Sequence, residues 1–469
     1  MMARRLVVLT PVWLLLTTLA CAAWWEHFAL AKGAIDTAPA RDLAAAERGR
    51  VALTLEGFLK ADWSDRVYHN AARRWDEPAP DPDNDPAAYA AAFRHRYGLH
   101  PAPYRNDALP MGLRRGLGPA GTKTGIQIDC LLCHGGSIGG KSYLGLGNTQ
   151  LDLRPLLYDL TIVDGLRAPF STFTLNTSRG TNNAGQIAAA LLSLRNPNLS
   201  VRIFPLPLEA NLPEMDTPAW WHLKRKRTMY YDGRTDARSV RTNMQFLLGE
   251  KSLAGLKALE PAFRDIQAFM KSLEPPKYPF PIDRTRAARG QVVFDAKCKR
   301  CHGTYGPGGT YPNKIIPLDE IGTDPARSEG LSDRLVAHFN KTWLGAEYPV
   351  NTQRVGYQAP PLDGIWATAP YLHNGSVPTL HALLDSPSRP DRFTRPPSTE
   401  FEHYDTEHVG WKFKEVSSEE LAATARRSSF RAKFIVDTAR FGMSNAGHIF
   451  GDRLSEVQRM DLIEYLKTL

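Results

Sequence analysis

Two short stretches of the chain place two cysteines and a histidine in the same arrangement. They are IQIDCLLCHGGSIGG and AKCKRCHGT, and each contains Cys-x-x-Cys-His. The six residues are Cys130, Cys133 and His134 in the first and Cys298, Cys301 and His302 in the second. In a chain with five cysteines and thirteen histidines, chance placement gives even one such motif in only about one of several hundred sequences. The repeat therefore points to a shared chemical role.

The spacing of the motif matches the edge of a porphyrin. Positions i and i+3 lie on one face of a helical turn, so two thiols reach the two vinyl groups of one haem and form thioethers. The histidine that follows lies beneath the iron and supplies its fifth ligand. The sequence therefore predicts two covalently bound haem c groups, with His134 and His302 as iron ligands.

Two other uses of paired cysteines fit the motifs less well. A zinc site uses cysteine pairs but does not need a histidine in the same register at both of them. A thioredoxin-like redox pair requires a strand-to-helix setting, and GIQIDCLLCHGGSIGG does not provide one.

Composition excludes two broad classes of protein. The chain has 469 residues, of which 43% are hydrophobic and 10% aromatic, and this composition is typical of a globular protein rather than a disordered one. The formal net charge is +9, but the run KRKR at 224–227 is short, so nucleic-acid binding is not predicted. The propionates of two haems add about four negative charges, which offset part of the basic excess.

The N-terminus has the features of an export segment. Arg4 and Arg5 precede an apolar run from Leu6 to Trp25, and small residues around Cys21 offer a cleavage site. We expect residues 1–28 to be a signal peptide or an N-terminal membrane anchor, with lipid attachment at Cys21 as a third alternative. The predicted location is the periplasm or cell envelope.

The hydrophobic patterns predict a mainly α fold, with two cytochrome c-like haem domains, long loops and little β structure. Helical patterns cover 40–59, 85–97 and 253–273, whereas the glycine-rich region 112–147 predicts a loop around the cofactor.

A proline-rich stretch divides the chain into two halves. Residues 275–283 form the predicted linker, because its prolines stop any helix. We place an N-terminal haem domain with a helical extension at 29–274 and a C-terminal cytochrome c domain at 284–469. The second domain opens with a helix that delivers the second motif, and its last helix begins at a capping box of Ser455 and Gln458. We expect these two helices to pack across each other.

Two further stretches carry a family resemblance. LDGIWATAPYLHNGSVPTLHALL, residues 362–384, resembles the TAPYFHDGS region of bacterial di-haem cytochrome c peroxidases, MauG-type enzymes and haem rubber oxygenases. DTPAWWHLKRKRTMYYDGR, residues 216–234, is similar to the peroxidase segment that runs from Asn-Thr-Pro to Phe-Trp-Asp-Gly-Arg. With both motifs in order, the resemblance spans about 112–469, nearest the rubber-oxygenase branch.

The resemblance implies a division of labour between the two haems. His134 is then the proximal ligand of the reactive iron, and His302 is the proximal ligand of the electron-transfer iron. The electron-transfer iron takes a second ligand, for which His448 is the first candidate and Met443 the alternative.

The same resemblance assigns roles to three aromatic residues. Tyr231 falls where the peroxidases have a tryptophan between the haems, so it is a candidate electron relay. Trp220 and Trp221 are candidates for the distal side of the reactive haem. In each case the alternative is packing in the core.

A calcium ion between the domains is also implied. Asp216 and the backbone carbonyls of Thr368 and Pro370 fall on the calcium ligands of the peroxidases, and a carboxylate suits this cation. The alternative is that Asp216 caps a helix. His373 is expected to bond to a haem propionate or to the backbone rather than to iron.

The sequence contains no obvious distal ligand for the first haem. Peroxidases of this group carry a distal histidine just before the Asn-Thr-Pro, but VRIFPLPLEANLPEM, residues 201–215, has none. An open position is therefore expected, with Glu250, Gln245 or His222 as candidate acid or base groups.

Two functions remain open. The first is an exported oxidoreductase, peroxidase-like or oxygenase-like, that activates peroxide or dioxygen and receives electrons from a small cytochrome or cupredoxin. The second is a di-haem electron carrier without substrate chemistry, in which a second residue ligates the first iron. The candidates for that ligand are Met215, Met229, Met244 and His222.

Overall fold

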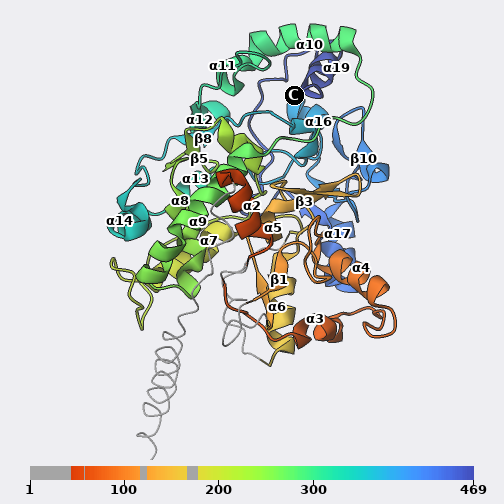
Figure 1. The fold of residues 1–469 in the computed structure, drawn as a ribbon. Coiled ribbons are helices and arrows are strands. Elements are labelled where there is room, and N and C mark those ends of the chain that lie inside the picture. The colour runs from red at the N-terminus through yellow and green to blue at the C-terminus, as the bar shows by residue number, and fades with distance from the viewer. Residues whose placement is uncertain (1–43, 57–58, 117–123, 166–177) are drawn as a thin grey trace, which may run out of the picture.

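The protein is described here by a computed structural model, which defines residues 44–56, 59–116, 124–165 and 178–469. The predicted export segment at 1–28 lies outside these residues. None of the helices in the described ranges is long and apolar enough to span a membrane. The described chain is mainly helical, as predicted, with long connecting loops (Figure 1).

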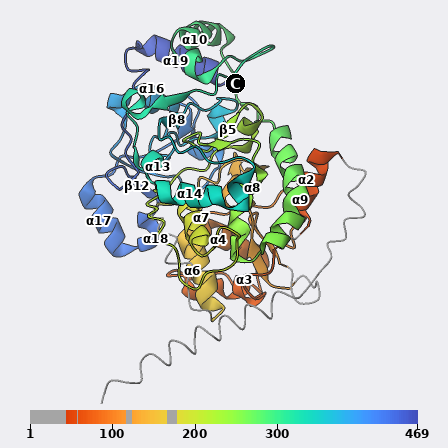
Figure 2. The ribbon, with the colours of Figure 1, turned by 90° about the vertical axis from the view of Figure 1, so that its left-hand side faces the viewer.

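The longer helices lie at both ends of the molecule and on more than one side of it (Figures 1 and 2). They are α2 (Ala45–Thr54), α4 (Pro86–Tyr97), α6 (Leu153–Val163), α7 (Ala184–Ser193), α9 (Leu253–Ser272), α10 (Arg284–Lys297), α14 (Asp333–Lys341), α17 (Ser418–Arg427) and α19 (Glu456–Leu466). Shorter helices include α3 (Arg66–Asn70), α5 (Leu131–His134), α8 (Val240–Asn243), α11 (Lys299–His302), α12 (Leu318–Ile321), α13 (Ala326–Glu329), α15 (Trp343–Ala346), α16 (Leu380–Leu384), α18 (Ser429–Ala432) and the 3-10 turn η6 (Trp220–Lys224).

The described strands pair only as two-stranded antiparallel ribbons. The pairs are β1 (Leu113–Arg115) with β2 (Ile126–Ile128), β3 (Gly135–Ile138) with β4 (Lys141–Leu144), β5 (Thr228–Met229) with β6 (Thr235–Asp236), β7 (Ile315–Pro317) with β8 (Gly356–Gln358), β9 (Arg392–Thr394) with β12 (Ile435–Asp437), and β10 (Tyr404–Asp405) with β11 (Gly410–Trp411).

Local signals place several helices where the sequence predicts them. Asp85 caps α4 by accepting a hydrogen bond from the Ala88 N–H at 3.0 Å. Gly98, with φ 67°, ends the same helix in the left-handed conformation that glycine adopts without strain. The predicted helix at 253–273 is α9. Of the predicted helix at 40–59, residues 40–43 and 57–58 lie outside the described residues, and within those described α2 covers Ala45–Thr54.

The glycine-rich region 112–147 is not the loop that the sequence predicts. It forms the ribbon β1–β2 before the first motif and the hairpin β3–β4 after it. Gly139 and Gly140 join β3 to β4 with φ values of 58° and 71°. Two consecutive residues with positive φ make the tight turn that suits a two-residue hairpin. The glycines therefore build a turn that fixes the exit from the motif.

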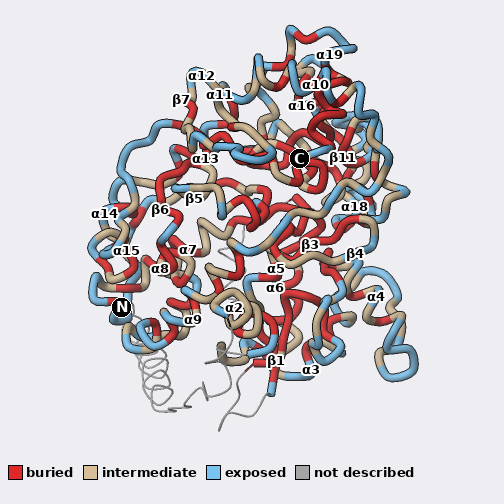
Figure 3. Tube along the Cα trace, turned by 45° about the horizontal axis from the view of Figure 1, so that its top comes forward, coloured by how far each residue is buried: buried red, intermediate tan, exposed pale blue. Residues whose placement is uncertain are grey.

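The two halves of the chain share their hydrophobic cores. The cluster around α10, α16 and α19 also contains Ile138 and Leu146 from the N-terminal half. Conversely, Leu335 and Phe339 of α14 pack in the cluster around α2 and α9. Figure 3 shows buried backbone running from the region of α5 and β3 to the region of α16.

The first and last helices of the C-terminal half pack against each other, as predicted (Figure 1). The capping box at the start of α19 is present, with Ser455 and Gln458 bonding reciprocally. Arg286 and Arg289 of α10 donate to the carboxylate of Asp461 at 3.1 and 2.7 Å. Gly290 lies at the crossing, where an added Cβ would overlap the carbonyl oxygen of Asp461.

Replacing Gly290 with alanine tests this close approach. We expect Gly290→Ala to lower the free energy of unfolding by about 1–3 kcal/mol, because the added methyl group forces the helices apart. Gly255→Ala in α9 is the matched control. A Cβ at Gly255 meets only ordinary contacts, so alanine there gains about 0.5–1 kcal/mol of helix stability. Thermal unfolding measures both changes, and equal effects of the two variants would contradict the close packing of α10 on α19.

Candidate functional site

The second motif lies at the end of α10, beside a large cavity. Cys298 follows the last residue of α10, and α11 then carries Cys301 and His302. All three residues line a cavity of about 230 Å³. Burial raises the pKa of Cys298 to about 12.

The ring of His302 is held with one nitrogen free. Its Nδ1 lies 2.8 Å from the carbonyl oxygen of Pro360, which accepts a hydrogen bond from the Nδ1–H tautomer. Burial lowers the pKa of His302, and the Pro360 carbonyl opposes this effect. Tyr305 fixes the turn by donating to the His302 carbonyl oxygen at 3.0 Å. The neutral ring is therefore held in the tautomer whose Nε2 can bind a metal.

His448 faces His302 across the cavity. The centroids of the two rings lie 6.3 Å apart, with 65° between their planes. A metal ion bound by one nitrogen of each ring, at about 2 Å from each nitrogen, separates the centroids by about 6 Å. Burial, then the neighbouring His302, lowers the pKa of His448 to about 3, so this ring is neutral as well. The two histidines therefore fit a single iron between them.

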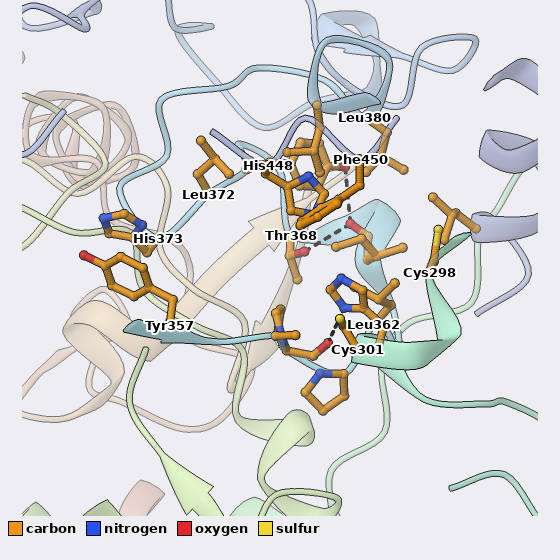
Figure 4. Close-up of a pocket in the computed structure, with 18 of the residues that line it drawn as sticks. Cys298, Cys301, Tyr357, Leu362, Thr368, Leu372, His373, Leu380, His448 and Phe450 are labelled. Carbon is orange, nitrogen blue, oxygen red and sulfur yellow. Dashed lines mark hydrogen bonds between the residues drawn. The ribbon is translucent and has the colours of Figure 1, made fainter. Parts of the chain in front are cut away.

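The walls of the cavity suit an amphipathic macrocycle. Apolar side chains line most of it, including Phe294, Leu362, Leu380, Leu454 and Leu462. Figure 4 shows His448 and Phe450 on the wall opposite Cys301, with His373 and Tyr357 at the end away from Cys298. Two donor groups that line the cavity have no partner among the described residues, namely the Thr323 hydroxyl and Nε2 of His373. These buried groups would suit the carboxylates of a haem.

The first motif is placed by the ribbon and hairpin on either side of it. Asp129 accepts a hydrogen bond from the Leu131 N–H at 2.8 Å, and it also forms a buried ion pair with Arg114 of β1 at 3.2 Å. After the motif, the Gly145 N–H donates to the carbonyl oxygen of His134 at 2.8 Å. Cys130 precedes α5 and Cys133 lies within it, on the turn between these anchors.

His134 is also a neutral histidine beside a proline carbonyl. Burial lowers its pKa to about 4, and the carbonyl of Pro218 opposes this effect. Its Nδ1 has no hydrogen-bond partner among the described residues. The two motif histidines therefore have similar surroundings, with Pro218 at the first and Pro360 at the second. The sequence analysis missed both prolines, since neither lies near its histidine in the chain.

The two tryptophans have different surroundings. Trp220 stacks on the His134 ring, with centroids 4.8 Å apart and 26° between the planes. Trp221 is 1% exposed, packs in the C-terminal core and donates to the Asp363 carbonyl at 2.8 Å.

Tyr231 lies at the polar end of the C-terminal cavity. Its hydroxyl donates to the Asp216 carbonyl at 3.2 Å, and its ring lies 6.0 Å from that of His373. His373 in turn stacks on Tyr357 at 4.3 Å. Burial, then the nearby Arg327, lowers the pKa of His373 to about 3.

The three residues of the predicted calcium site line this same cavity. Asp216, Thr368 and Pro370 come together there, and Oδ1 of Asp216 has no hydrogen-bond partner in the described residues. Burial raises the pKa of Asp216 to about 8, against the opposing effect of Arg395. The described residues contain no group of three His, Cys, Asp or Glu that could hold a metal, so backbone oxygens would have to complete the site.

The remaining candidates are scattered. His222 lines the C-terminal cavity and bonds to the Asp363 carbonyl at 2.9 Å, so it lies at the second site. Glu250 accepts from the Lys60 N–H at 3.1 Å, and Gln245 lies beside Tyr230. Burial and repulsion from Glu250 raise the pKa of Asp62 to about 7, and sequence patterns did not identify this carboxyl group.

The methionine candidates also lie in different places. Met443 packs in a small cluster with Phe393 and Val436 and does not line the cavity of His302. Met244 lies in the core cluster that contains Leu131 of the first motif.

Comparison with known proteins identifies part of the C-terminal half. Residues 356–394 match the family described as RoxA-like, cytochrome c-like. Two Sinorhizobium fredii proteins described as uncharacterized are similar in sequence. Protein y4iM is 32% identical over 240 residues, which cover 43% of this chain and 52% of that protein. Protein y4iJ is 31% identical over 266 residues, which cover 42% of this chain and 41% of that protein.

Among the solved structures that match is the Kuenenia stuttgartiensis hydrazine synthase pressurized with xenon, at low identity. The alignment has 14% identity and a TM-score of 0.22, and it covers 63% of this chain and 90% of that one. A TM-score of this size does not establish a common fold. The family match, however, falls on β8, α16 and β9 beside the second motif. The chain therefore contains a cytochrome c-like region, and such a domain carries covalently bound haem c.

Proposed function

We propose that the chain is an exported di-haem c oxidoreductase of the peroxidase or oxygenase type. In this proposal the His134 site reacts with peroxide or dioxygen, and the His302 site carries electrons. The observation that supports it best is the asymmetry between the two sites. His302 faces His448 at 6.3 Å, whereas His134 has no second histidine ring against it in the described part of the chain.

The sequence around the first site supports an open position. The internal segments outside the described residues, 57–58, 117–123 and 166–177, contain no histidine and no methionine. His100 lies near the first motif, but both of its ring nitrogens are occupied. They lie 2.7 Å from the Ser137 hydroxyl and 3.0 Å from Oδ1 of Asn148.

A haem c with an open iron position supplies redox chemistry with peroxide or dioxygen when it is bound. The chain's own part is to hold each histidine neutral and aligned and to keep the second site closed. Burial keeps both histidines neutral by lowering their pKa, and the Pro360 carbonyl aligns the His302 ring. His448 keeps the second site closed by occupying the space opposite His302.

A single short segment connects the two sites. Pro218 and Trp220 contact His134, and Trp221 and His222 both bond to the Asp363 carbonyl beside the second cavity. We propose this segment, rather than Tyr231 alone, as the route for electrons. The stacked indole of Trp220 is the part of the route closest to His134.

The partner and the location are part of the same proposal. A small soluble cytochrome or cupredoxin is the proposed electron donor, and the apolar run at 6–25 supports export to the periplasm or cell envelope. The curated relatives that the chain matches are aligned over about half of their length or less, so their names transfer no activity to it.

The ferric protein with its haems bound gives the first test of the proposed function. We expect low-temperature EPR to show one high-spin and one low-spin signal, because only one site has a second histidine. Hydrogen peroxide should change the high-spin signal and leave the low-spin signal in place at first. Two low-spin signals that ignore peroxide, before and after partial reduction, would instead identify an electron carrier.

Counting the covalent haems tests the two motifs separately. We expect denatured full-length protein to retain two haems by intact mass. The double variants Cys130→Ala/Cys133→Ala and Cys298→Ala/Cys301→Ala should each retain one, because thioether bonds need the thiols. A pyridine haemochrome assay gives the iron count independently. One haem in the unaltered protein would contradict a di-haem enzyme.

Calcium is the proposed third cofactor. Oδ1 of Asp216 and Oε1 of Gln358 line the cavity without hydrogen-bond partners, and both are oxygen acceptors. The carbonyl oxygens of Thr368 and Pro370 accept no hydrogen bond from the described residues. Buried acceptors without donors suit a hard cation. Because burial raises the pKa of Asp216 to about 8, binding must displace a proton and weakens as the pH falls.

Chelation tests the calcium site. At about 100 times its Kd, calcium should stabilise the folded protein by about 2.7 kcal/mol, so EGTA should lower Tm. Asp216→Ala should remove this response. Asp152→Ala serves as the matched control, because Asp152 is also buried but pairs with Lys433 at 2.8 Å. That variant should lower Tm yet keep its response to EGTA, and a response retained in Asp216→Ala would exclude this site.

A further inference from the structure

The loop that carries His448 has an unfavourable backbone conformation. Gly447 has φ 76° and His448 has φ 50°, so a residue with a side chain follows glycine in the left-handed region. A non-glycine residue adopts this conformation at a cost and keeps it only where the surroundings enforce it. The contacts of residues 442–448, here called the ligand loop, show what enforces it.

Arg389 clamps one side of the ligand loop. Its Nη1 donates to the carbonyl oxygens of Asn445 and Gly447 at 2.6 and 2.7 Å, and its Nη2 donates to that of His448 at 3.3 Å. The same guanidinium is anchored to α16 through the carbonyl oxygens of Ala382 and Leu383, both at 3.0 Å. One side chain therefore ties the loop to a helix that lines the cavity.

Asn374 and Ser376 hold the start of the ligand loop. The Asn374 amide donates to the carbonyl oxygens of Gly442 and Ser444, both at 2.9 Å. The Ser376 hydroxyl donates to the Ser444 carbonyl at 3.2 Å. Both side chains are fully buried, at 0% exposure.

The other side of the ligand loop packs on the segment after α12. The His448 N–H donates to the Ile321 carbonyl oxygen at 2.7 Å. Gly447 lies directly on Gly322, where an added Cβ would overlap the backbone. The loop is thus enclosed between two backbones and three polar side chains.

Arg389 is a buried cation that forms no ion pair among the described residues. Its side chain is 9% exposed, and its five hydrogen bonds all go to main-chain carbonyls. The acidic groups nearby are engaged elsewhere, since Asp385 pairs with Arg459 and Asp452 accepts from Ser386. Burying a cation is costly, so its bonds to this loop indicate a specific role.

We propose that Arg389, with Asn374 and Ser376, is a positioning residue that presents His448 to the iron of the His302 site. All three residues lie in the region 356–394 that matches the cytochrome c-like family. This inference rests on the proposed role of His448 as the second ligand. According to this proposal, residues of the cytochrome c-like region 356–394 hold the ligand loop 442–448, which lies outside that region.

The haem-loaded full-length chain tests this proposal with Arg389→Gln and Arg389→Lys. Losing two or more charged hydrogen bonds should lower the ratio of His448-bound to unbound iron at least about tenfold. EPR should then show the low-spin signal replaced by a high-spin one, and carbon monoxide should bind the reduced protein faster. Arg389→Lys should recover part of the low-spin signal, because an ammonium group reaches fewer carbonyls.

Arg459→Gln is the matched control. Arg459 is also a buried arginine bonded to the Leu384 carbonyl, at 3.2 Å, but it makes no contact with the ligand loop. The Arg459→Gln variant should lower Tm while leaving the low-spin signal intact. A purely structural role for Arg389 would give the same pattern, with a lower Tm and an unchanged spin state, and that result would overturn the proposal.

Two further variants keep the result interpretable. If Arg389→Gln does not fold, two milder variants take its place. Ser376→Ala removes one hydrogen bond to the ligand loop and Asn374→Ser removes two. Both should speed carbon monoxide binding, and Asn374→Ser should have the larger effect. Unchanged rates in both would overturn the proposal. His448→Ala separates the two levels of inference. If it leaves the low-spin signal in place, the ligand assignment itself fails; if it removes that signal while Arg389→Gln does not, only the positioning role fails.

Discussion

The separation of His302 from His448 is the constraint on which the C-terminal half depends. Two imidazoles can share a metal only within a narrow range of distance, and the observed 6.3 Å between centroids lies in that range. Three contacts set it. The α10 helix is locked on α19 through Gly290 and Asp461, Pro360 orients His302, and the ligand loop presents His448. Each of these elements comes from a distant part of the chain.

A second constraint links this half to the other. Residues 216–222 contact His134 on one side and line the second cavity on the other. A segment this short cannot serve both sites unless the halves are packed together, and their shared cores achieve this. The proposed electron route therefore lies at the contact between the two halves.

Burial gives the sites their chemical character. It lowers the pKa of His134, His302 and His448, so all three rings are neutral and able to bind metal. It also leaves polar atoms without partners, notably on Asp216 and His373. Most of the other residues that line this cavity are apolar, so the cavity has both polar and apolar walls, as a haem has polar and apolar edges.

The sequence by itself determined the two Cys-x-x-Cys-His turns, the helix that delivers the second one and the capped helix at the C-terminus. These features depend on local spacing, which a chain carries wherever it folds. Only the tertiary structure decided that Trp220 stacks on His134, that Pro360 orients His302, and that Arg389 holds the ligand loop. These contacts join residues far apart in the chain, and no local periodicity encodes which distant backbone will lie beside a given side chain.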